Sequence, residues 1–357
     1  MTKRRVVVRG TGTIGTAGLR LVIEHPELEL VGLLVHGRDK IGKDAGDVAG
    51  TAKTGIIATD DVDAILALRP DCLAHFGNSA MREEAVNAEM IPFLQRGINV
   101  VTTSQMDVFQ PRHGRQEYVA PIARACEEGG APIFSSGTEP GFCTTGFPLN
   151  LLSIGGRVDE VRVAEIANLS EYGGVDNLKL YGFGEPLGNE PPIFTSPIGQ
   201  AWHASTVRCF ADYMGVELEE VTSTWETAAL DFDIEPLFGH IPAGMTVATR
   251  WRMVGYSGGK PFITYTKLER LHDDAAPDWE KGSVGTADNN VFWRAEIIGE
   301  PSYTSEIGVS LVPSVAMTPA HPVNAIPVVC DAPPGILDPM RMPPFWTRHV
   351  GPGLVRA

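Results

Sequence analysis

The stretch that decides the fold lies near the start of the chain, where residues 6–15 read VVVRGTGTIG. The valine run is typical of a buried strand, and apolar residues at helical spacing follow the glycines. Between such a strand and helix, Gly10 permits the tight turn, Gly12 lets a pyrophosphate approach the backbone, and Gly15 allows close packing. The stretch therefore predicts a dinucleotide site, with a ligand-free turn as the alternative. Its expected residues are Gly10, Thr11, Gly12, Thr13, Ile14 and Gly15.

The residues that follow the second apolar run, 28–35, indicate which dinucleotide to expect. NAD-selective sites usually place an acid at the end of this strand, where it binds the ribose hydroxyls. This chain instead reads HGRDK at residues 36–40. We assign His36, Arg38 and Lys40 to the cofactor site and expect NADP(H) to be favoured, with NAD(H) tolerated, because cations there can bind a 2′-phosphate. Two alternatives stay open: the cations are ordinary loop charges, or Asp39 binds the ribose and reverses the preference.

Strand-like and helical segments alternate strictly up to about residue 140. This order predicts an α/β fold with a Rossmann-type doubly wound parallel sheet that carries helices on both faces. In such a sheet, the loops that follow the strands line the ligand crevice. Gly77 and Asn78 follow one predicted strand and Thr103 follows the next, so we expect these three residues near the cofactor.

Beyond Gly141 the pattern changes to strand-like alternation broken by turns rich in glycine and proline. Residues 246–254 and 262–268 flank Gly258-Gly259 and predict a hairpin, and 291–298 with 304–311 predict another pair. We therefore expect a second α+β domain with a mostly antiparallel open sheet, one face of which packs on helices. The expected domains are 1–140 for dinucleotide binding, 141–312 for substrate binding and dimerisation, and 313–357 as a segment that returns to the first domain.

Length and composition narrow the class of protein. The 357 residues suffice for two domains, and the net charge of −15 argues against a general binder of nucleic acid or anionic membranes. No apolar run approaches membrane-spanning length, and too few apolar residues follow the basic start for a signal peptide. The five cysteines show no CxxC spacing, so we expect reduced thiols, a cytoplasmic location and no metal site. We also expect a homodimer.

Six stretches that cover nearly the whole chain match a known family: 10–15, 24–32, 99–103, 137–142, 181–184 and 323–327. Through them the chain resembles the dihydrodipicolinate-reductase-like oxidoreductases, in the branch of 2,4-diaminopentanoate dehydrogenases and native amine dehydrogenases. The resemblance implies that the first domain binds NAD(P)H and that the substrate pocket lies in the cleft. It implies a reaction that joins a carbonyl to ammonia, or the reverse deamination. It also implies a glutamate, after the strand at 99–103, that handles the amine.

The chain departs from this family at the position of that glutamate, where it has Gln105. A neutral amide takes up no proton at working pH and cannot be the general base. Asp107, two residues on, and Glu139, which follows the neighbouring strand, are carboxylates that could compensate. The alternatives are that Asp107 is solvated and that Glu139 caps a turn. The chain also lacks the His-His pair of the proper dihydrodipicolinate reductases, which argues against that activity.

The resemblance raises four aromatic residues as candidates for the pocket, although each could be ordinary core: Phe142, Tyr172, Tyr181 and Phe183. Tyr172 could also donate a hydrogen bond to a carbonyl or imine. His203 is a further pocket candidate, with a structural role as its alternative.

Together these features predict an NAD(P)H-dependent oxidoreductase that acts on a small C=O or C=N substrate. In its sharpest form it carries out reductive amination or oxidative deamination, as amine dehydrogenases do. Gln105 favours one alternative, a carbonyl, imine or ene reductase that does not use ammonia. A module of another class, which binds the cofactor or senses redox state without turnover, is the third reading.

Overall fold

The computed structural model describes residues 2–77 and 82–351, so Asn78 lies outside the described residues. The chain forms two compact units, which are described separately below. Unit 1 comprises Met1–Thr138 and Val315–Ala357, and unit 2 comprises Glu139–Ser314.

Unit 1 is built on a seven-stranded sheet in the order β13-β6-β5-β4-β1-β2-β3. All of its strand pairs are parallel, and β1 lies between β2 and β4, where the strand order reverses. The predicted parallel, doubly wound sheet is therefore confirmed. Its strands are β1 (Arg4–Arg9), β2 (Leu28–Leu34), β3 (Ala58–Thr59), β4 (Cys72–His75), β5 (Asn99–Thr102), β6 (Pro132–Ser135) and β13 (Gly335–Ile336).

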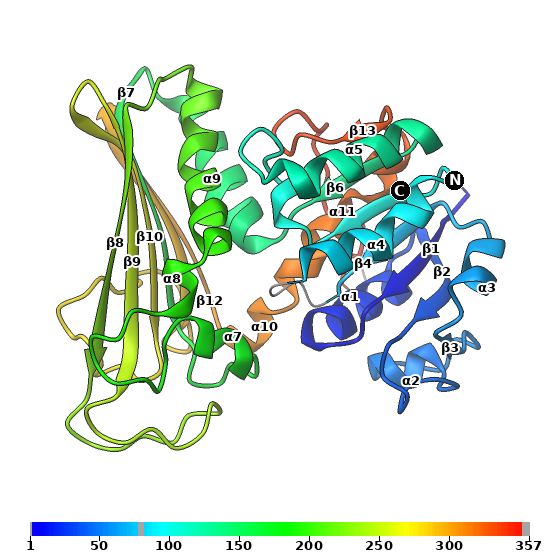
Figure 1. Cartoon of the computed structure of the whole chain (residues 1–357), viewed down its shortest axis with the longest axis horizontal. Coiled ribbons are helices and arrows are strands. Elements are labelled where there is room, and N and C mark those ends of the chain that lie inside the picture. The colour runs from blue at the N-terminus through cyan, green and yellow to red at the C-terminus, as the bar shows by residue number, and fades with distance from the viewer. Residues whose placement is uncertain (1, 78–81, 352–357) are drawn as a thin grey trace. The chain divides into compact units, whose positions relative to one another are not determined.

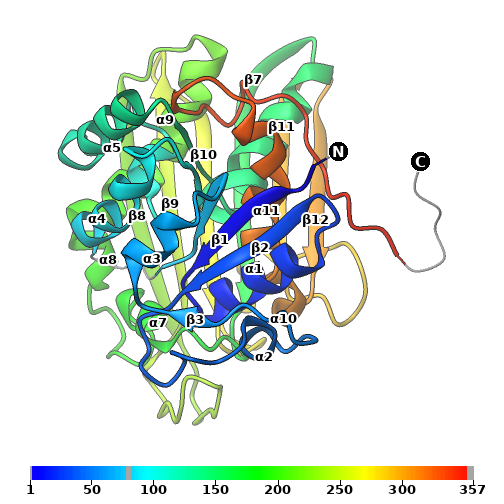
Figure 2. The same cartoon turned by 90° about the vertical axis from the view of Figure 1, so that its right-hand side faces the viewer.

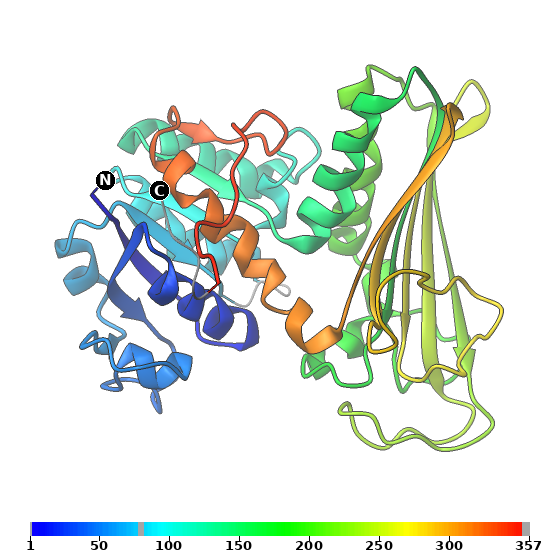
Figure 3. The ribbon, with the colours of Figure 1, turned by 180° about the vertical axis from the view of Figure 1, so that it is seen from behind.

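Helices cover both faces of this sheet (Figure 2). α1 (Thr13–Glu24) and α11 (Met317–Cys330) share one face and one apolar cluster, as Figure 3 shows from behind. α4 (Glu83–Leu94) and α5 (Gln116–Gly129) pack against the other face. Residues 315–357 belong to unit 1, and α11 packs against α1 and β5. The shorter elements are α2 (Ala45–Ala49), α3 (Val62–Ala67) and the 3-10 turn η1 (Met106–Val108).

Residues 37–50, which are rich in glycine, aspartate and lysine and read as a loop from the sequence, contain the short helix α2. Asp44 caps this short helix by accepting a hydrogen bond from the backbone N–H of Gly46, and Gly50 ends it in the left-handed region at φ 68°. An aspartate before a short run that ends in glycine is a typical helix signal. Five residues are too few to show a helical period, so the pattern did not reveal the helix.

Unit 2 is built on a six-stranded sheet in the order β12-β11-β7-β10-β9-β8. Only the β7–β10 pair is parallel, and every other pair is antiparallel. The predicted mostly antiparallel sheet and both predicted hairpins, β9–β10 and β11–β12, are therefore confirmed. The strands are β7 (Arg157–Asn168), β8 (Glu220–Ala229), β9 (Thr246–Ser257), β10 (Lys260–Arg270), β11 (Val291–Glu300) and β12 (Tyr303–Val309).

One face of this sheet carries α9 (Pro197–Met214), and no helix of the described residues covers the other face (Figure 1). Neither α9 nor β8 was predicted. β8 is rich in threonine and largely half-exposed, so it shows no clean alternation. For α9 a local signal existed, since Ser196 caps the helix and Pro197 occupies its first turn. The remaining helical segments are η2 (Thr138–Gly146), α6 (Phe147–Leu151), η3 (Leu152–Ile154), α7 (Val175–Leu180), α8 (Pro192–Thr195) and α10 (Leu311–Ser314).

Among the helices of the described residues, none combines the length and the apolar character that crossing a membrane requires.

Candidate active site

The glycine turn of unit 1 has the geometry that nucleotide binding requires. Gly10 adopts φ +96°, and a Cβ on it would lie 2.6 Å from the carbonyl oxygen of Phe76. A Cβ on Gly15 would lie 2.3 Å from the carbonyl oxygen of Gly10, so both positions require glycine. Gly12 differs, because a Cβ there would meet nothing within 4 Å. The space in front of Gly12 is therefore open, as close approach of a phosphate demands.

The N-terminus of α1 is also suited to an anion. Gly12 is the N-cap residue, no side chain of the described residues caps the helix, and its first turn carries no acid. Thr13 is exposed and Ile14 is half-buried. The unpaired N–H groups and the helix dipole favour a negative group at this position. The residues present therefore fit the pyrophosphate of a dinucleotide.

A lysine side chain lies directly on this turn. Lys40 Nζ donates to the carbonyl oxygen of Thr11 at 2.6 Å and to Thr11 Oγ1 at 3.1 Å. Arg38 and Asp39, two and one residues before it, are exposed. The ammonium group of Lys40, which lies in the loop after β2, is therefore a cation beside the glycine turn.

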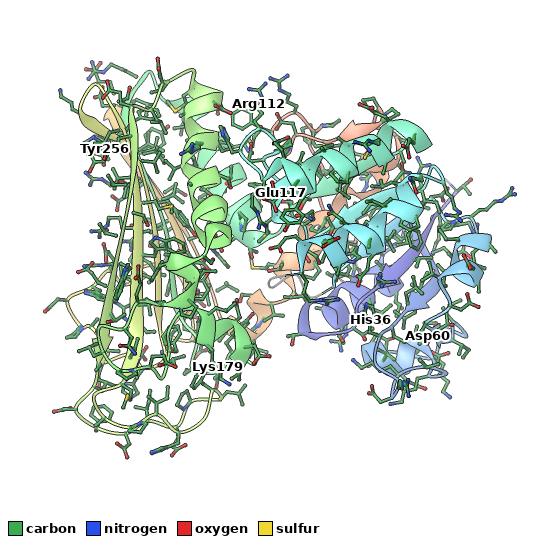
Figure 4. All side chains as sticks on the ribbon, in the orientation of Figure 1. His36, Asp60, Arg112, Glu117, Lys179 and Tyr256 are labelled. Carbon is green, nitrogen blue, oxygen red and sulfur yellow. The ribbon has the colours of Figure 1, made fainter. Side chains whose placement is uncertain are left out.

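His36, labelled in Figure 4, belongs to a network of basic side chains around one carboxylate. Glu89 of α4 accepts from Arg9 Nε at 2.9 Å and pairs with His75 Nε2 at 2.8 Å and with His36 Nε2 at 3.1 Å. Burial alone would raise the pKa of Glu89, but the hydrogen bonds from His75 and Arg9 outweigh it and bring that pKa well below its usual range. No local pattern in the sequence indicates that Glu89, far along the chain, contacts His36.

The loops after β4 and β5 lie together at the carboxyl edge of the same sheet. Ser104 Oγ donates to the carbonyl oxygen of Gly77 at 2.7 Å, and the backbone N–H of Thr103 donates to that of His75 at 3.3 Å. Thr103 and Gly77 are both half-buried. Parallel strands end at one edge, so these loops lie at the same edge of the sheet as the glycine turn, where α/β sheets bind ligands.

Gln105 and Asp107 are buried within unit 1. Gln105 is fully buried, and its amide donates to Asn87 Oδ1 at 2.5 Å. Asp107 is 2% exposed and accepts from Arg115 through Nε at 3.1 Å and through Nη2 at 2.8 Å. The alternative that Asp107 is solvated is therefore wrong. Both side chains have the contacts of structural residues, which leaves Glu139 as the candidate with a different environment.

Glu139, the first residue of unit 2, belongs to a buried cluster centred on Lys267 of β10. Lys267 Nζ lies 3.4 Å from Glu139 Oε2, 2.9 Å from Glu165 Oε2 and 3.1 Å from Glu269 Oε1. Tyr265 Oη donates to Glu139 Oε1 at 2.8 Å. We call these five residues the lysine cluster. Glu139 therefore does more than cap a turn, because its carboxylate contacts two side chains of β10.

The lysine cluster is an unusual electrostatic environment, since three carboxylates surround a single ammonium group. Burial raises the pKa of Glu165 to about 7, because the attraction of Lys267 offsets it only in part while Glu139 and Glu269 add to it. Burial would lower the pKa of Lys267, but the three carboxylates hold it well above its usual range. Buried groups with strongly shifted pKa values of this kind are typical of functional sites.

Two predicted aromatic residues adjoin the lysine cluster. The ring of Tyr181 lies 5.6 Å from Lys267 Nζ. Burial raises the pKa of Tyr172, and the nearby charge of Glu269 adds to this rise. Phe183 is 1% exposed, whereas Phe142 is 39% exposed and lies against Phe147 with ring centroids 6.5 Å apart.

His203 lies within α9, and its side chain is outside the described residues. Sequence reasoning missed Lys267, Glu165, Glu269 and Tyr265. A signal existed, because Tyr265, Lys267 and Glu269 alternate along β10 and so share one face with the apolar Ile263. Charges on the apolar face of a strand indicate a buried charged group, which must be paired.

Comparison with known proteins places both units in one family. The family model described as dihydrodipicolinate reductase, N-terminus, matches residues 4–104. An amine dehydrogenase from Streptomyces virginiae is 31% identical over 343 residues, which cover 94% of this chain and 95% of that protein. A 2,4-diaminopentanoate dehydrogenase from Acetoanaerobium sticklandii is 22% identical over 352 residues, which cover 94% of this chain and 92% of that protein.

A solved structure of an amine dehydrogenase from Mycobacterium smegmatis is similar in fold, with a TM-score of 0.78 and 19% identity. The match covers 97% of this chain and 98% of that one. Both units of the present chain therefore have counterparts in that structure.

Proposed function

Because the chain belongs to the amine dehydrogenase family of NAD(P)-dependent oxidoreductases, we propose that it joins ammonia to a small ketone or aldehyde, or runs the reverse deamination. The observation that carries this proposal is the lysine cluster, in which Glu139 is a buried carboxylate beside Lys267 and Tyr265. A cationic amine is favoured beside an excess of buried carboxylates, since it restores the charge balance. Glu139 then takes over the role that Gln105 cannot fill.

The position of Glu139 in the chain supports this role. It comes four residues after Ser135, the last residue of β6. Loops that follow the strands of a doubly wound sheet line the ligand crevice. Glu139 is therefore a carboxylate in the kind of loop that borders the cofactor. In the deamination direction it accepts a proton from the substrate ammonium group, and in the amination direction it returns one.

The cofactor site is proposed on the glycine turn. The backbone of residues 10–15 holds the pyrophosphate. Lys40, Arg38 and His36 lie in the loop after β2 and surround the ribose. Lys40 on Thr11 favours a 2′-phosphate, so we propose a preference for NADP(H) over NAD(H). Gly77 and Thr103 border the nicotinamide half, and the bound nicotinamide supplies or accepts the hydride.

The substrate is proposed to lie against the lysine cluster, beside the rings of Tyr172 and Tyr181. Phe142, Phe183 and His203 complete the proposed pocket. Tyr172 is the hydrogen-bond donor to the carbonyl or imine.

The test is consumption of the reduced cofactor with a panel of ketones and aldehydes, with and without ammonium. We expect consumption of NADPH that depends on ammonium, and a lower KM for NADPH than for NADH. Consumption that does not need ammonium would instead support the second candidate, a carbonyl, imine or ene reductase, which the neutral Gln105 favours. Binding of the cofactor without turnover on any substrate would contradict both.

We also propose that the protein is a cytoplasmic homodimer. Among the described residues, no helix covers the face of the six-stranded sheet opposite α9. The label of Tyr256 marks β9 of this sheet in Figure 4. The five cysteines are free thiols, which suits a reducing compartment. Sedimentation equilibrium tests the dimer, and a monomer at micromolar concentration would contradict it.

A further inference from the structure

The lysine cluster contains one carboxylate more than amine binding through Glu139 requires. We propose that Lys267 links Glu139 to Glu165 as a proton relay, in which Glu165 stores the proton that the amine reaction releases. Lys267 is then a positioning residue, since it acts through the two carboxylates. This inference rests on the proposed function and assigns the proton path of that same site.

The geometry gives a continuous path. Lys267 Nζ lies 3.4 Å from Glu139 and 2.9 Å from Glu165, so one ammonium group bridges both carboxylates. The side chains of Glu139 and Glu165 are each 12% exposed, and that of Lys267 is 7% exposed. Bulk water therefore has little access to the cluster, and a proton that leaves Glu139 has an ammonium group as its neighbour.

The proton balance of the reaction requires such a store. Deamination converts an ammonium-bearing substrate, oxidised cofactor and water into a carbonyl, an ammonium ion and reduced cofactor, with one proton left over. Glu139 takes a proton from the substrate nitrogen and passes it to Lys267 Nζ, while Lys267 gives one of its own protons to Glu165. Lys267 stays an ammonium group, Glu139 becomes a carboxylate again, and Glu165 becomes a carboxylic acid. Amination runs the same steps in reverse.

Among the described residues, the charged and titratable groups around Glu165 come from four segments. β10 contributes Lys267, Glu269 and Tyr265, and residue 139 contributes its carboxylate. The Cys143 thiol feels the charge of Glu165, as do Tyr172 and Tyr181. Only Lys267 is a cation, so this environment raises the pKa of Glu165 to about 7 and lets it change its protonation state near neutral pH.

A purely structural ion pair accounts poorly for the cluster. Such a pair matches one ammonium group with one carboxylate, because each unmatched buried charge costs several kcal/mol. Here the second oxygen of Glu269, Oε2, is buried without a hydrogen-bond partner among the described residues. The negative charges of the cluster are therefore not fully compensated by Lys267. Such an excess suits a site that exchanges protons.

The test uses Glu165→Gln, which keeps the shape of the side chain and removes its ability to hold a proton. Infrared titration of the full-length protein without substrate should show a carboxyl that titrates at about pH 7 in the wild type and is missing in E165Q. With NADP⁺ and an amine, kcat of the wild type should rise with pH through that range, because Glu165 must be ionised to accept the proton. E165Q should lose this rise and about tenfold in kcat, with the KM for the cofactor unchanged.

The matched control is Glu217→Gln, the same substitution at an exposed position outside both sites, which should behave like the wild type. If E165Q does not fold, Glu165→Asp withdraws the carboxyl from Lys267 by one methylene and should shift the titration. No carboxyl titration near neutral pH in the wild type, or a folded E165Q with unchanged kcat and pH profile, would overturn the relay. A wild type that shows the titration but turns over no amine or ketone would contradict the proposed function and leave the proton store standing.

Discussion

Each unit contains a buried charge network, and the two have opposite balance. In unit 1, one carboxylate, Glu89, is paired with Arg9 at 2.9 Å and Arg82 at 3.7 Å, and it shares hydrogen bonds with His75 and His36. In unit 2, one ammonium group, Lys267, is surrounded by three carboxylates. The pKa of Glu89 accordingly falls well below its usual range, while that of Glu165 rises to about 7. The same type of side chain is thus shifted in opposite directions by its neighbours.

The difference shows what each network is suited to bind. A surplus of cations attracts an anion, such as the phosphates of a dinucleotide, and a surplus of carboxylates attracts a cation, such as a protonated amine. The net charge of −15 hides this division, because it averages over both units. Five changes of residue or of condition test this contrast.

The largest effect is expected for Glu139→Gln. This substitution removes the proton acceptor and keeps the size of the side chain, so kcat for amine oxidation should fall about 100- to 1000-fold. The KM for the cofactor should stay within about twofold of the wild-type value, because the glycine turn is untouched. Steady-state kinetics with an amine and NADP⁺ measure both. An unchanged kcat would remove Glu139 from the reaction.

Asp107→Asn should instead act on stability. It breaks the buried pair with Arg115, whose guanidinium keeps Glu83 Oε1 at 3.1 Å as its remaining carboxylate, so the free energy of unfolding should fall by about 2 kcal/mol. The kcat of the folded enzyme should change little. Urea denaturation measures the loss, and Asp60→Asn, at an exposed position labelled in Figure 4, is the control. A large loss of kcat in a stable variant would return Asp107 to the catalytic candidates.

Gly12→Ala tests the phosphate site without disturbing the fold. A Cβ there meets no atom within 4 Å, so the melting temperature should be close to that of the wild type. The methyl group would occupy the space of the pyrophosphate, and the Kd for NADPH should rise by about 10- to 30-fold. Gly15→Ala is the contrast, since its Cβ would clash with Gly10 and should lower the melting temperature as well. Full affinity in Gly12→Ala would move the cofactor elsewhere.

Lys40→Ala tests the cation on the glycine turn. Loss of one charge that binds phosphate should raise the KM for NADPH by about tenfold and that for NADH by less. Lys43→Ala removes an exposed lysine from the same loop and serves as the control. Equal changes for NADPH and NADH would mean that Lys40 does not recognise the 2′-phosphate.

The smallest effect is a pH dependence of stability. The folded protein keeps a proton on Glu165 up to about pH 7, whereas the unfolded chain releases it near the ordinary value of 4.5. The stability that this proton provides is fully present below pH 4.5 and is lost as the pH rises through about 7. Relative to E165Q, the free energy of unfolding should therefore fall by ~1–3 kcal/mol over that window. Urea denaturation at several pH values measures it, and parallel curves would contradict the raised pKa.

Local patterns in the sequence were sufficient for the framework of both units. The glycine turn is formed by residues that are close together in the chain, so residues 6–15 were enough to predict it. The hairpins of unit 2 likewise follow from alternation on either side of a glycine turn. α9 and β8 were missed because their residues are not cleanly amphipathic, and their assignment depends on packing against the rest of the sheet.

Local sequence patterns were enough for the fold class and for the place of the glycine turn, and they predicted Gln105 at the position where the resemblance implies a glutamate. Only the tertiary structure decided which carboxylates meet. Glu139, Glu165 and Lys267 lie far apart in the chain, and the parallel pairing of β7 with β10 brings Glu165 opposite Lys267. Glu89 reaches His36 in the same way, from a helix more than fifty residues away. A pKa depends on neighbours in space. Strand register, which decides which side chains become neighbours, cannot be predicted from a local pattern of residues.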